Sequence, residues 1–371
     1  MTSWATEHSQ AGTVFQAQRF GDFPTMKEAL IARKIDATFM IAPLAMKLVA
    51  DGVPVKIVYL GHRDGSALTI AKDSSVQRFE DLAGKRVAIP SRYSNQNLLM
   101  RRMMKQRGME PQAIELVEMA PPDMASALAA RSIEGYIVGE PHNAKAEIGG
   151  YGRILYFMKD LWPDFISCVL VVRQEIIEER RPLVQELVQG IADSGAWLDD
   201  PEDSLDHRKR AAEVVGKLFY NQDPKLLEHV LLQPNRVAYS RLVPPKDTFD
   251  EIMDLAVETK VIERRMRFEE YCDTSFASSL REITVNGKCI HSHVLQVLCH
   301  AITHALRIAE HNCFPSCICD SRNHFVFIHL VDCQEQVVHR SNSVCWRIDR
   351  YFFWRLHVST HKVAYLAIEC C

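Results

Sequence analysis

A run of hydrogen-bonding side chains, Ser91-Arg-Tyr-Ser-Asn-Gln96, lies between an apolar stretch and an amphipathic one. Residues 86–90 have the composition of a buried strand, and residues 97–107 have helical periodicity. The first N–H groups of a helix have no intrahelical partner, and they carry partial positive charge. We therefore expect this run to bind a small oxyanion. The alternative is an ordinary helix cap by Ser94, which needs no ligand.

A second polar run, Gly61-His-Arg-Asp-Gly-Ser66, follows another apolar stretch and is predicted to be a loop at a strand end. His62 or Ser66 can contact a ligand from such a loop. A solvated turn, in which neighbouring charges form a surface ion pair, is the alternative interpretation of the same residues.

Two more predicted strand ends, Ala42-Pro-Leu44 and Gly139-Glu-Pro141, occupy equivalent positions in a repeated segment described below. The carboxylate of Glu140 would repel an anion unless it pairs with a cation, binds a ligand amine or holds a structural position. The candidate ligand-binding residues are therefore Pro43, His62, Ser66, Tyr93, Ser94, Asn95, Gln96 and Glu140.

Catalytic motifs are absent from the sequence: it contains no Gly-x-Ser-x-Gly, His-Glu-x-x-His or phosphate-loop pattern. Cys168 lies in an apolar stretch, where a cysteine is more often an inert core residue than a nucleophile. The cysteines around Cys313-Phe-Pro-Ser-Cys317 do not have the spacing of a standard zinc site. We expect no catalytic residue, no metal and no cofactor.

An internal repeat shows which elements must position these residues. Residues 24–43 align with residues 122–141 without a gap, and 8 of the 20 positions are identical. Each copy reads as a capped helix, an acidic turn and an apolar strand that ends in proline. Because the agreement extends through helix, turn and strand, we interpret it as the same half of a parallel α/β unit made twice.

Around the repeat, predicted strands alternate with predicted helices, which is typical of parallel sheets covered by helices. Residues 67–71 and 169–172 follow corresponding points of the two copies and are predicted to cross between two lobes as a hinge. The expected fold class is a two-lobed α/β fold, with a ligand cleft between the lobes. The predicted lobes are residues 1–84 with 170–287, and residues 85–169.

Composition changes abruptly near Gly287. Nine of the 11 cysteines and 10 of the 15 histidines lie after it, in a stretch with no glycine. We interpret residues 288–371 as a Cys/His-rich tail unrelated to the lobes, either a fused sequence or the product of a shifted reading frame.

The net charge of −3 and the lack of a basic run argue against nucleic acid as a partner. The first ten residues do not resemble a signal peptide.

Three stretches resemble the nitrate/sulfonate/taurine solute-binding family of ABC transporters, the type II periplasmic binding proteins. They are Gly21-Asp-Phe-Pro24 through Ile41-Ala-Pro-Leu44, Leu82-Ala-Gly-Lys-Arg-Val-Ala-Ile-Pro90 with Ser94-Asn-Gln-Asn97, and Ile137-Val-Gly-Glu-Pro141 with Gly149-Gly-Tyr-Gly152. The resemblance covers residues 20–280. It implies an extracytoplasmic receptor, monomeric, that delivers a small anion or sulfonate-like solute to a membrane permease.

The resemblance also exposes a departure and two alternatives. Only about twenty unmatched residues precede Phe20, so the first strand of the first lobe is expected to be missing or replaced. Thiamine-pyrimidine synthases share the fold, but their cysteine-rich run is reduced here to one cysteine in Phe165-Ile-Ser-Cys-Val-Leu170. The other alternative is a defective fragment without activity.

Overall fold

The computed structural model describes residues 2–9, 11–218, 223–233, 236–281 and 363–368. These residues belong to one compact unit that holds two β-sheets. The rest of the predicted tail, residues 288–362 and 369–371, lies outside the described residues. No helix within the described ranges is both long enough and apolar enough to cross a membrane.

The first sheet has the strand order β1-β11-β2-β9-β3-β10. Its strands are β1 (Val14–Arg19), β2 (Ala37–Met40), β3 (Val55–Asp64), β9 (Ile166–Arg173), β10 (Val237–Ala238) and β11 (Val363–Ile368). All eight residues of β9 are buried, because this strand lies in the middle of the sheet with β2 and β3 as neighbours. Residues 168–172 of this strand form an uninterrupted apolar run, as expected of a strand that is covered on both faces.

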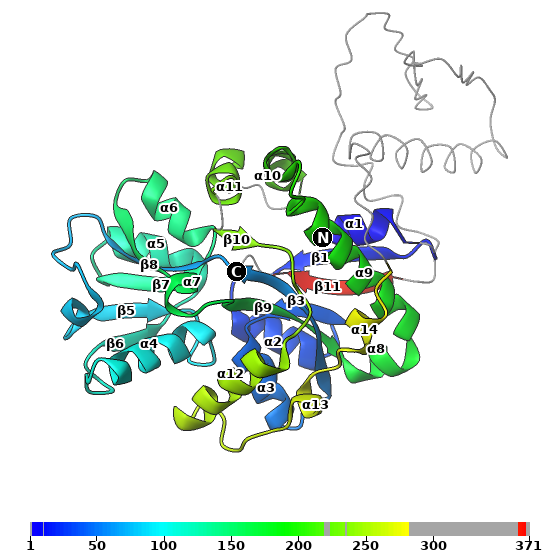
Figure 1. The fold of residues 1–371 in the computed structure, drawn as a ribbon, viewed down its shortest axis with the longest axis horizontal. Helices are drawn as coiled ribbons and strands as arrows, with labels where there is room; N and C mark the ends of the chain where they lie inside the picture. Colours follow the sequence, from blue (N-terminus) through cyan, green and yellow to red (C-terminus); the bar gives the residue numbers. More distant parts are fainter. Residues whose placement is uncertain (1, 10, 219–222, 234–235, 282–362, 369–371) are drawn as a thin grey trace, which may run out of the picture. The chain divides into compact units, whose positions relative to one another are not determined.

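The second sheet has the strand order β6-β5-β7-β4-β8. Its strands are β4 (Ser66–Ala71), β5 (Arg86–Ile89), β6 (Glu115–Glu118), β7 (Gly135–Gly139) and β8 (Gly152–Phe157). β5 is parallel to β6 and β7, whereas β4 is antiparallel to both of its neighbours. Two α/β lobes, one around each sheet, are thus present as predicted (Figure 1).

Fourteen α-helices and one 3₁₀ helix connect the strands in the described ranges. They are α1 (Thr2–Glu7), α2 (Phe23–Ile31), α3 (Ala42–Ala50), η1 (Phe79–Leu82), α4 (Asn95–Gln106), α5 (Pro121–Ala129), α6 (His142–Ile148), α7 (Met158–Leu161), α8 (Gln174–Glu179), α9 (Arg181–Leu198), α10 (Ser204–Leu218), α11 (Pro224–Leu231), α12 (Lys246–Glu258), α13 (Phe268–Tyr271) and α14 (Ser275–Ser278).

The two copies of the repeat form the same structure, as the sequence predicts. The first copy is α2 followed by β2, and the second is α5 followed by β7. Arg33 and Arg131, which are aligned in the repeat, both adopt a left-handed backbone conformation, with φ of 58° and 61°. Because non-glycine residues rarely adopt this conformation, the shared turn is strong evidence that the two copies are equivalent units.

The chain crosses between the lobes at places that differ from the prediction. The first crossing is the short connection from β3 to β4 at Gly65, and the second is residues 158–165, between β8 and β9. Residues 67–71 lie wholly inside the second sheet, so strand pairing begins the second lobe at Ser66 and not at residue 85.

The predicted loop at residues 61–66 is also corrected. It is mostly strand, because β3 continues to Asp64 through a stretch of irregular pairing with β9 around His62.

The strand β11 lies inside the first sheet, next to the edge strand β1. It is parallel to both β1 and β2, with Val14 opposite Val363 and Ala37 opposite Leu366. Helix α2 connects β1 to β2, which are not adjacent in the sheet. β11 lies between them and pairs with both. The sequence led us to expect that the first strand of the first lobe is missing or replaced. The structure has a strand before Phe20, β1, and β11 lies between it and β2.

Helix α9 approaches the chain around Tyr239 so closely that it has no room for a side chain at Gly195. A Cβ atom placed there would overlap the Tyr239 carbonyl oxygen. Glycine to alanine inside a helix ordinarily stabilises by about 1 kcal/mol, whereas forced overpacking costs about 1–3 kcal/mol. Because the overlap is with backbone, we expect Gly195→Ala to lower the free energy of unfolding, measured by urea denaturation. Gly21→Ala, at a site with open space, is the control, and an equal effect would contradict the packing.

Candidate functional site

A pocket lies between the two lobes, with walls from both. Its cavity volume, the space that a water-sized sphere can occupy, is about 10 Å³. Phe23 and Ile41 line it from the first lobe. The second lobe contributes Pro90, Gln96, Pro121, Val138 and Gly139.

The position of the pocket follows from the direction of the strands. Ile41 comes directly after β2, Pro90 directly after β5, and Gly139 ends β7. Ligands of open α/β sheets bind outside the carboxyl ends of the strands, because the loops and helix starts gather there. The pocket thus lies where the strand ends of both lobes meet.

Four helices begin at this pocket. Phe23 is the first residue of α2, Ile41 is the N-cap of α3, Gln96 is in the first turn of α4, and Pro121 is the first residue of α5. Each helix has at least nine residues, and each directs the positive end of its dipole toward the pocket. A negative charge at this point is therefore favoured by all four helices.

Among these four helices, α4 has the most hydrogen-bond donors to offer. The other three carry proline at the first or second helical position, and proline has no N–H group. In α4, the Ser94 side chain accepts from the Asn97 N–H, while the N–H groups of Asn95 and Gln96 have no intrahelical partner. The start of α4 is thus the strongest anion-binding end in the pocket.

Gln96 is the polar side chain among the described residues that line the pocket. It is 2% exposed, and its Nε2 donates to the Ser66 hydroxyl at 3.1 Å. Its Oε1 is buried without a hydrogen-bond partner in the described part of the chain. Rotating the amide by a half-turn would let the Ser66 hydroxyl donate to Oε1 and free the NH₂ group. Gln96 can therefore offer either an acceptor or a donor to a ligand.

The neighbours of Gln96 serve the helix start. The Ser94 hydroxyl donates to the Ser91 carbonyl at 2.6 Å and accepts from Asn97 N at 3.0 Å. Ser94 is therefore the N-cap of α4, the role that the sequence left open as the alternative to ligand binding. Asn95 points away from solvent and donates to the Ile166 carbonyl at 2.6 Å. Tyr93 packs half-buried against the main core and is not among the residues that line the pocket.

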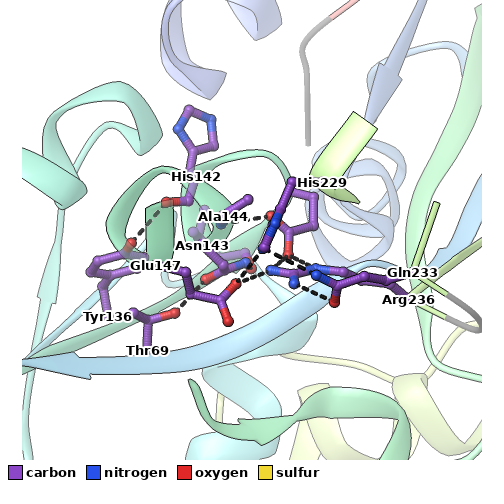
Figure 2. A network of polar contacts seen from close by, with 11 residues as sticks. Thr69, Tyr136, His142, Asn143, Ala144, Glu147, His229, Gln233 and Arg236 are labelled. Carbon is purple, nitrogen blue, oxygen red and sulfur yellow. Dashed lines mark hydrogen bonds and ion pairs between the residues drawn. The ribbon is translucent and has the colours of Figure 1, made fainter. Parts of the chain in front are cut away.

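Glu140 belongs to a buried ionic network beside the crossing at Gly65. Arg236 Nε donates to the Glu140 carboxylate at 2.6 Å, and the Ala144 N–H donates to the same group at 3.1 Å. Figure 2 shows the Arg236 guanidinium between Glu147 and Gln233, both of which accept hydrogen bonds from it. The carboxylate of Glu140 is used in this network and does not line the pocket.

The charge state of Glu140 reflects two opposing effects. Burial raises the pKa of this carboxyl group above its usual range. The positive charge of Arg236 and the hydrogen bonds from Ala144 and Arg236 oppose that rise. The sequence left three roles open for Glu140: pairing with a cation, binding a ligand amine, or a structural position. The geometry matches a structural pairing with the cation Arg236.

His62 and Pro43 lie near the site but not at its surface. His62 is on β3, and its ring centroid is 6.1 Å from that of Tyr239. Its Nδ1 atom is buried and has no hydrogen-bond partner in the described ranges. Pro43 is buried in the first turn of α3, two residues after Ile41. Neither is among the lining residues of the pocket.

The stability of the chain should depend on pH through His62. Burial lowers the pKa of its ring to about 4, because it disfavours the charged form. The unfolded chain takes up a proton below about pH 6.5, whereas the folded chain does not until about pH 4. The free energy of unfolding therefore falls as the pH drops through this window, by at most about 3 kcal/mol.

Substitution His62→Gln should remove this part of the pH dependence, which urea denaturation at several pH values between about 4 and 7 would measure. If His62→Gln and the original chain lose stability in parallel over that window, the ring is not held neutral in the fold.

The apolar wall of the pocket was not identified from the sequence. Phe23, Ile41, Pro121 and Val138 lie within stretches that also supply core residues, and nothing in their type separates the two roles. Their position directly at strand ends or helix starts is the signal in the sequence that could have identified them as pocket residues.

Within the described residues, no group of three or more His, Cys, Asp or Glu can hold a metal ion. Cys168 is 2% exposed and lies within β9.

Comparison with curated proteins identifies partial relatives. The nitrate import ATP-binding protein NrtC of Synechocystis sp. is 30% identical over 208 residues, which are 51% of this chain and 30% of that protein. The taurine-binding periplasmic protein of Escherichia coli is 26% identical over 171 residues, 43% of this chain and 52% of that protein. The chain thus spans between 30% and 52% of the length of these relatives.

Solved structures share the fold over most of the described chain. The ligand-binding component of an ABC-type import system from Staphylococcus aureus, determined with zinc bound, superposes with a TM-score of 0.66 at 25% identity. The superposition covers 76% of this chain and 92% of that one. The alkanesulfonate-binding protein SsuA of Xanthomonas axonopodis gives a TM-score of 0.62 at 17% identity, covering 73% and 91%.

A model of the NMT1-like family matches residues 7–216, which is more than half of the chain. The match includes both copies of the repeat, both crossings and the first turn of α4. The resemblance to the nitrate/sulfonate/taurine solute-binding family is confirmed, and the chain belongs to the NMT1-like family.

Proposed function

We propose that this chain is the substrate-binding component of an ABC importer and captures a small anionic solute, such as nitrate, a sulfonate or taurine, between its lobes. The observation that carries the proposal is the pocket at the starts of α2, α3, α4 and α5, whose walls come from both lobes. The names of the similar proteins, a nitrate importer subunit and a taurine-binding protein, support the same solute class.

The chemistry of the pocket favours an anion with a small apolar part. No basic side chain is among the described residues that line it, so the negative charge is balanced by helix dipoles and N–H groups. Phe23, Ile41 and Val138 provide apolar contact, and Gln96 provides one polar side chain. We propose Gln96 and the N–H groups of the first turn of α4 as the direct contacts, with Ser66 orienting the Gln96 amide.

Capture requires that the solute contacts both lobes. A solute between Phe23 of the first lobe and Gln96 of the second gains contacts from both walls in the closed arrangement and from only one wall when the lobes separate. This difference in contacts stabilises the closed arrangement. The proposal includes no catalytic step and no cofactor. It places the chain outside the cytoplasm, as a monomer that delivers its solute to a membrane permease.

A thermal unfolding screen of the full chain tests the proposal. Nitrate, bicarbonate, taurine and methanesulfonate are added separately, with chloride at equal ionic strength as the control. A solute that binds the folded state adds about 2.7 kcal/mol to its stability at one hundred times Kd, so at least one should raise the midpoint above the chloride value. A cooperative transition that none of the four shifts would contradict the proposal. A change in absorbance with pyridoxal phosphate would instead support the pyrimidine-synthase alternative.

A further inference from the structure

Two consecutive residues in the first turn of α4 hold the two places where the chain crosses between the lobes. The Asn95 side chain donates to the carbonyl of Ile166, the first residue of β9, at 2.6 Å. The Gln96 side chain donates to the hydroxyl of Ser66, the first residue of β4, at 3.1 Å. One helix turn is therefore bonded to both crossings and also borders the pocket.

The bond from Asn95 is made where the second crossing enters the first sheet. Ile166 is opposite Arg63 of β3, and the N–H of Asp64 donates to the Phe165 carbonyl at 2.9 Å. The two crossings therefore contact each other next to the atom that Asn95 binds. A displacement of the first turn of α4 changes the position of this junction directly, through one side-chain hydrogen bond.

Asn95 is buried more completely than its local role in the helix requires. It is 1% exposed, and its Oδ1 has no hydrogen-bond partner among the described residues. Ser94 already caps the helix, so Asn95 is not needed to begin it. A buried amide with one unused acceptor is unfavourable, and an alanine there would avoid that cost. The bond to Ile166 is the contact that accounts for an asparagine at this position.

We propose that Asn95 is a positioning residue that couples solute binding in the pocket to movement of the lobes. This inference rests on the proposed function. A solute that accepts hydrogen bonds from the first turn of α4 fixes the position of that turn, and Asn95 transmits the position to Ile166 and the second crossing. Loss of the Asn95 side chain leaves the pocket wall intact, but it removes the hydrogen bond that connects the first turn of α4 to the junction of the two crossings. Coupling between two sites of this kind typically changes affinity about 5- to 150-fold.

Asn97 provides a matched control on the same helix. It is also an asparagine in the first turn, and it is also buried, with 0% exposure. Its Nδ2 donates to the Arg92 carbonyl at 2.7 Å, and its Oδ1 accepts from Arg101 Nε at 3.1 Å. Both partners are in the second lobe, so these hydrogen bonds reach neither crossing. Asn97→Ala and Asn95→Ala thus both remove a buried amide from the first turn of α4. Asn97→Ala loses two hydrogen bonds within the second lobe, whereas Asn95→Ala loses one that reaches the second crossing.

The experiment measures the distance between the lobes and the affinity in the same full-length variants. Spin labels on non-natural amino acids replace Ile31 on α2 and Ile148 on α6, which are 41% and 54% exposed. Nitrate, taurine and methanesulfonate are the probes. We expect the distance distribution of the original chain and of Asn97→Ala to shift on addition of a bound probe. We expect Asn95→Ala to bind about 5- to 10-fold more weakly and to keep most of its solute-free distribution at saturation.

A full shift at saturation in Asn95→Ala would overturn the inference and leave the proposed function standing. The absence of any shift or binding in the original chain would overturn both.

Hydrogen exchange of the original chain gives a second test that needs no variant. Two backbone amides report on the crossings and lie outside the pocket wall. The Asp64 N–H donates to the Phe165 carbonyl, and the Gly65 N–H donates to the Arg236 carbonyl at 2.8 Å. A saturating probe should slow exchange of these two amides as well as those of the first turn of α4. Slowing confined to the pocket wall would overturn the inference even if Asn95→Ala failed to fold.

Discussion

Replacing Arg236 with methionine is expected to lower the free energy of unfolding by about 3–5 kcal/mol, the cost of removing one partner from a buried ion pair. The Arg236 side chain is 2% exposed and pairs with Glu140, whose side chain is 4% exposed. Without the guanidinium, the Glu140 carboxylate remains buried next to Glu147 with no cation beside it. Urea denaturation at neutral pH measures the loss.

Two further variants show whether this loss comes from the buried charge. Adding Glu140→Gln to Arg236→Met should recover part of the stability, since no uncompensated carboxylate then remains at that position. Arg241→Met is the control, because the ion pair of Arg241 with Asp164 is exposed, at 67% and 52%, and such pairs contribute less than about 1 kcal/mol. Equal losses for Arg236→Met and Arg241→Met would show that the network is not needed for stability.

The same network predicts how the loss changes with pH. In Arg236→Met, the pKa of Glu140 should rise further, because the main interaction that opposes its burial is gone. Protonation then removes the buried charge, so the difference in stability between the variant and the original chain should shrink as the pH falls. A difference that is constant with pH would indicate that lost packing, and not an unpaired carboxylate, causes the destabilisation.

Replacing Gln96 with leucine is expected to weaken solute binding about 10- to 100-fold, because one hydrogen bond to a charged group is worth about 1.5–3 kcal/mol. Leucine has similar bulk, so the pocket keeps its shape while its polar side chain is lost. The Ser66 hydroxyl also loses its partner, and the free energy of unfolding should fall by about 1 kcal/mol. Isothermal titration with a solute that stabilises the chain measures the affinity.

Gln106→Leu is the control for this substitution, since Gln106 is the exposed last residue of the same helix. Its affinity should equal that of the original chain. If Gln96→Leu also binds with unchanged affinity, the solute does not contact the pocket wall at this residue, and the binding site must be placed elsewhere.

Local patterns predicted much of the fold, because short-range preferences determine them. The repeat gave α2, β2, α5 and β7, and even the left-handed turns at Arg33 and Arg131 are aligned in it. The run at residues 91–96 indicated the start of α4, because a polar run between a buried strand and a helix marks a strand end. That same rule led to the pocket, which Gln96 borders.

Contacts between distant residues could not be predicted. Asn95 and Ile166 are 71 positions apart, and Glu140 and Arg236 are 96 apart, with no local pattern that relates either pair. The strand at residues 61–64 was mistaken for a loop because glycine and charged residues there are typical of turns, while irregular pairing with β9 keeps them in the sheet. The apolar residues of the pocket wall could not be distinguished from core residues in the sequence. Whether such a residue borders the pocket or the core depends on contacts between distant parts of the chain.

A crystal structure of the full chain grown with a stabilising solute would show directly where the solute binds. We expect the solute to lie between the lobes, to accept hydrogen bonds from the N–H groups of the first turn of α4, to contact the Gln96 amide and to pack against Phe23 and Ile41. A solute bound outside this pocket, or one that contacts a single lobe with Gln96 unengaged, would contradict this expectation.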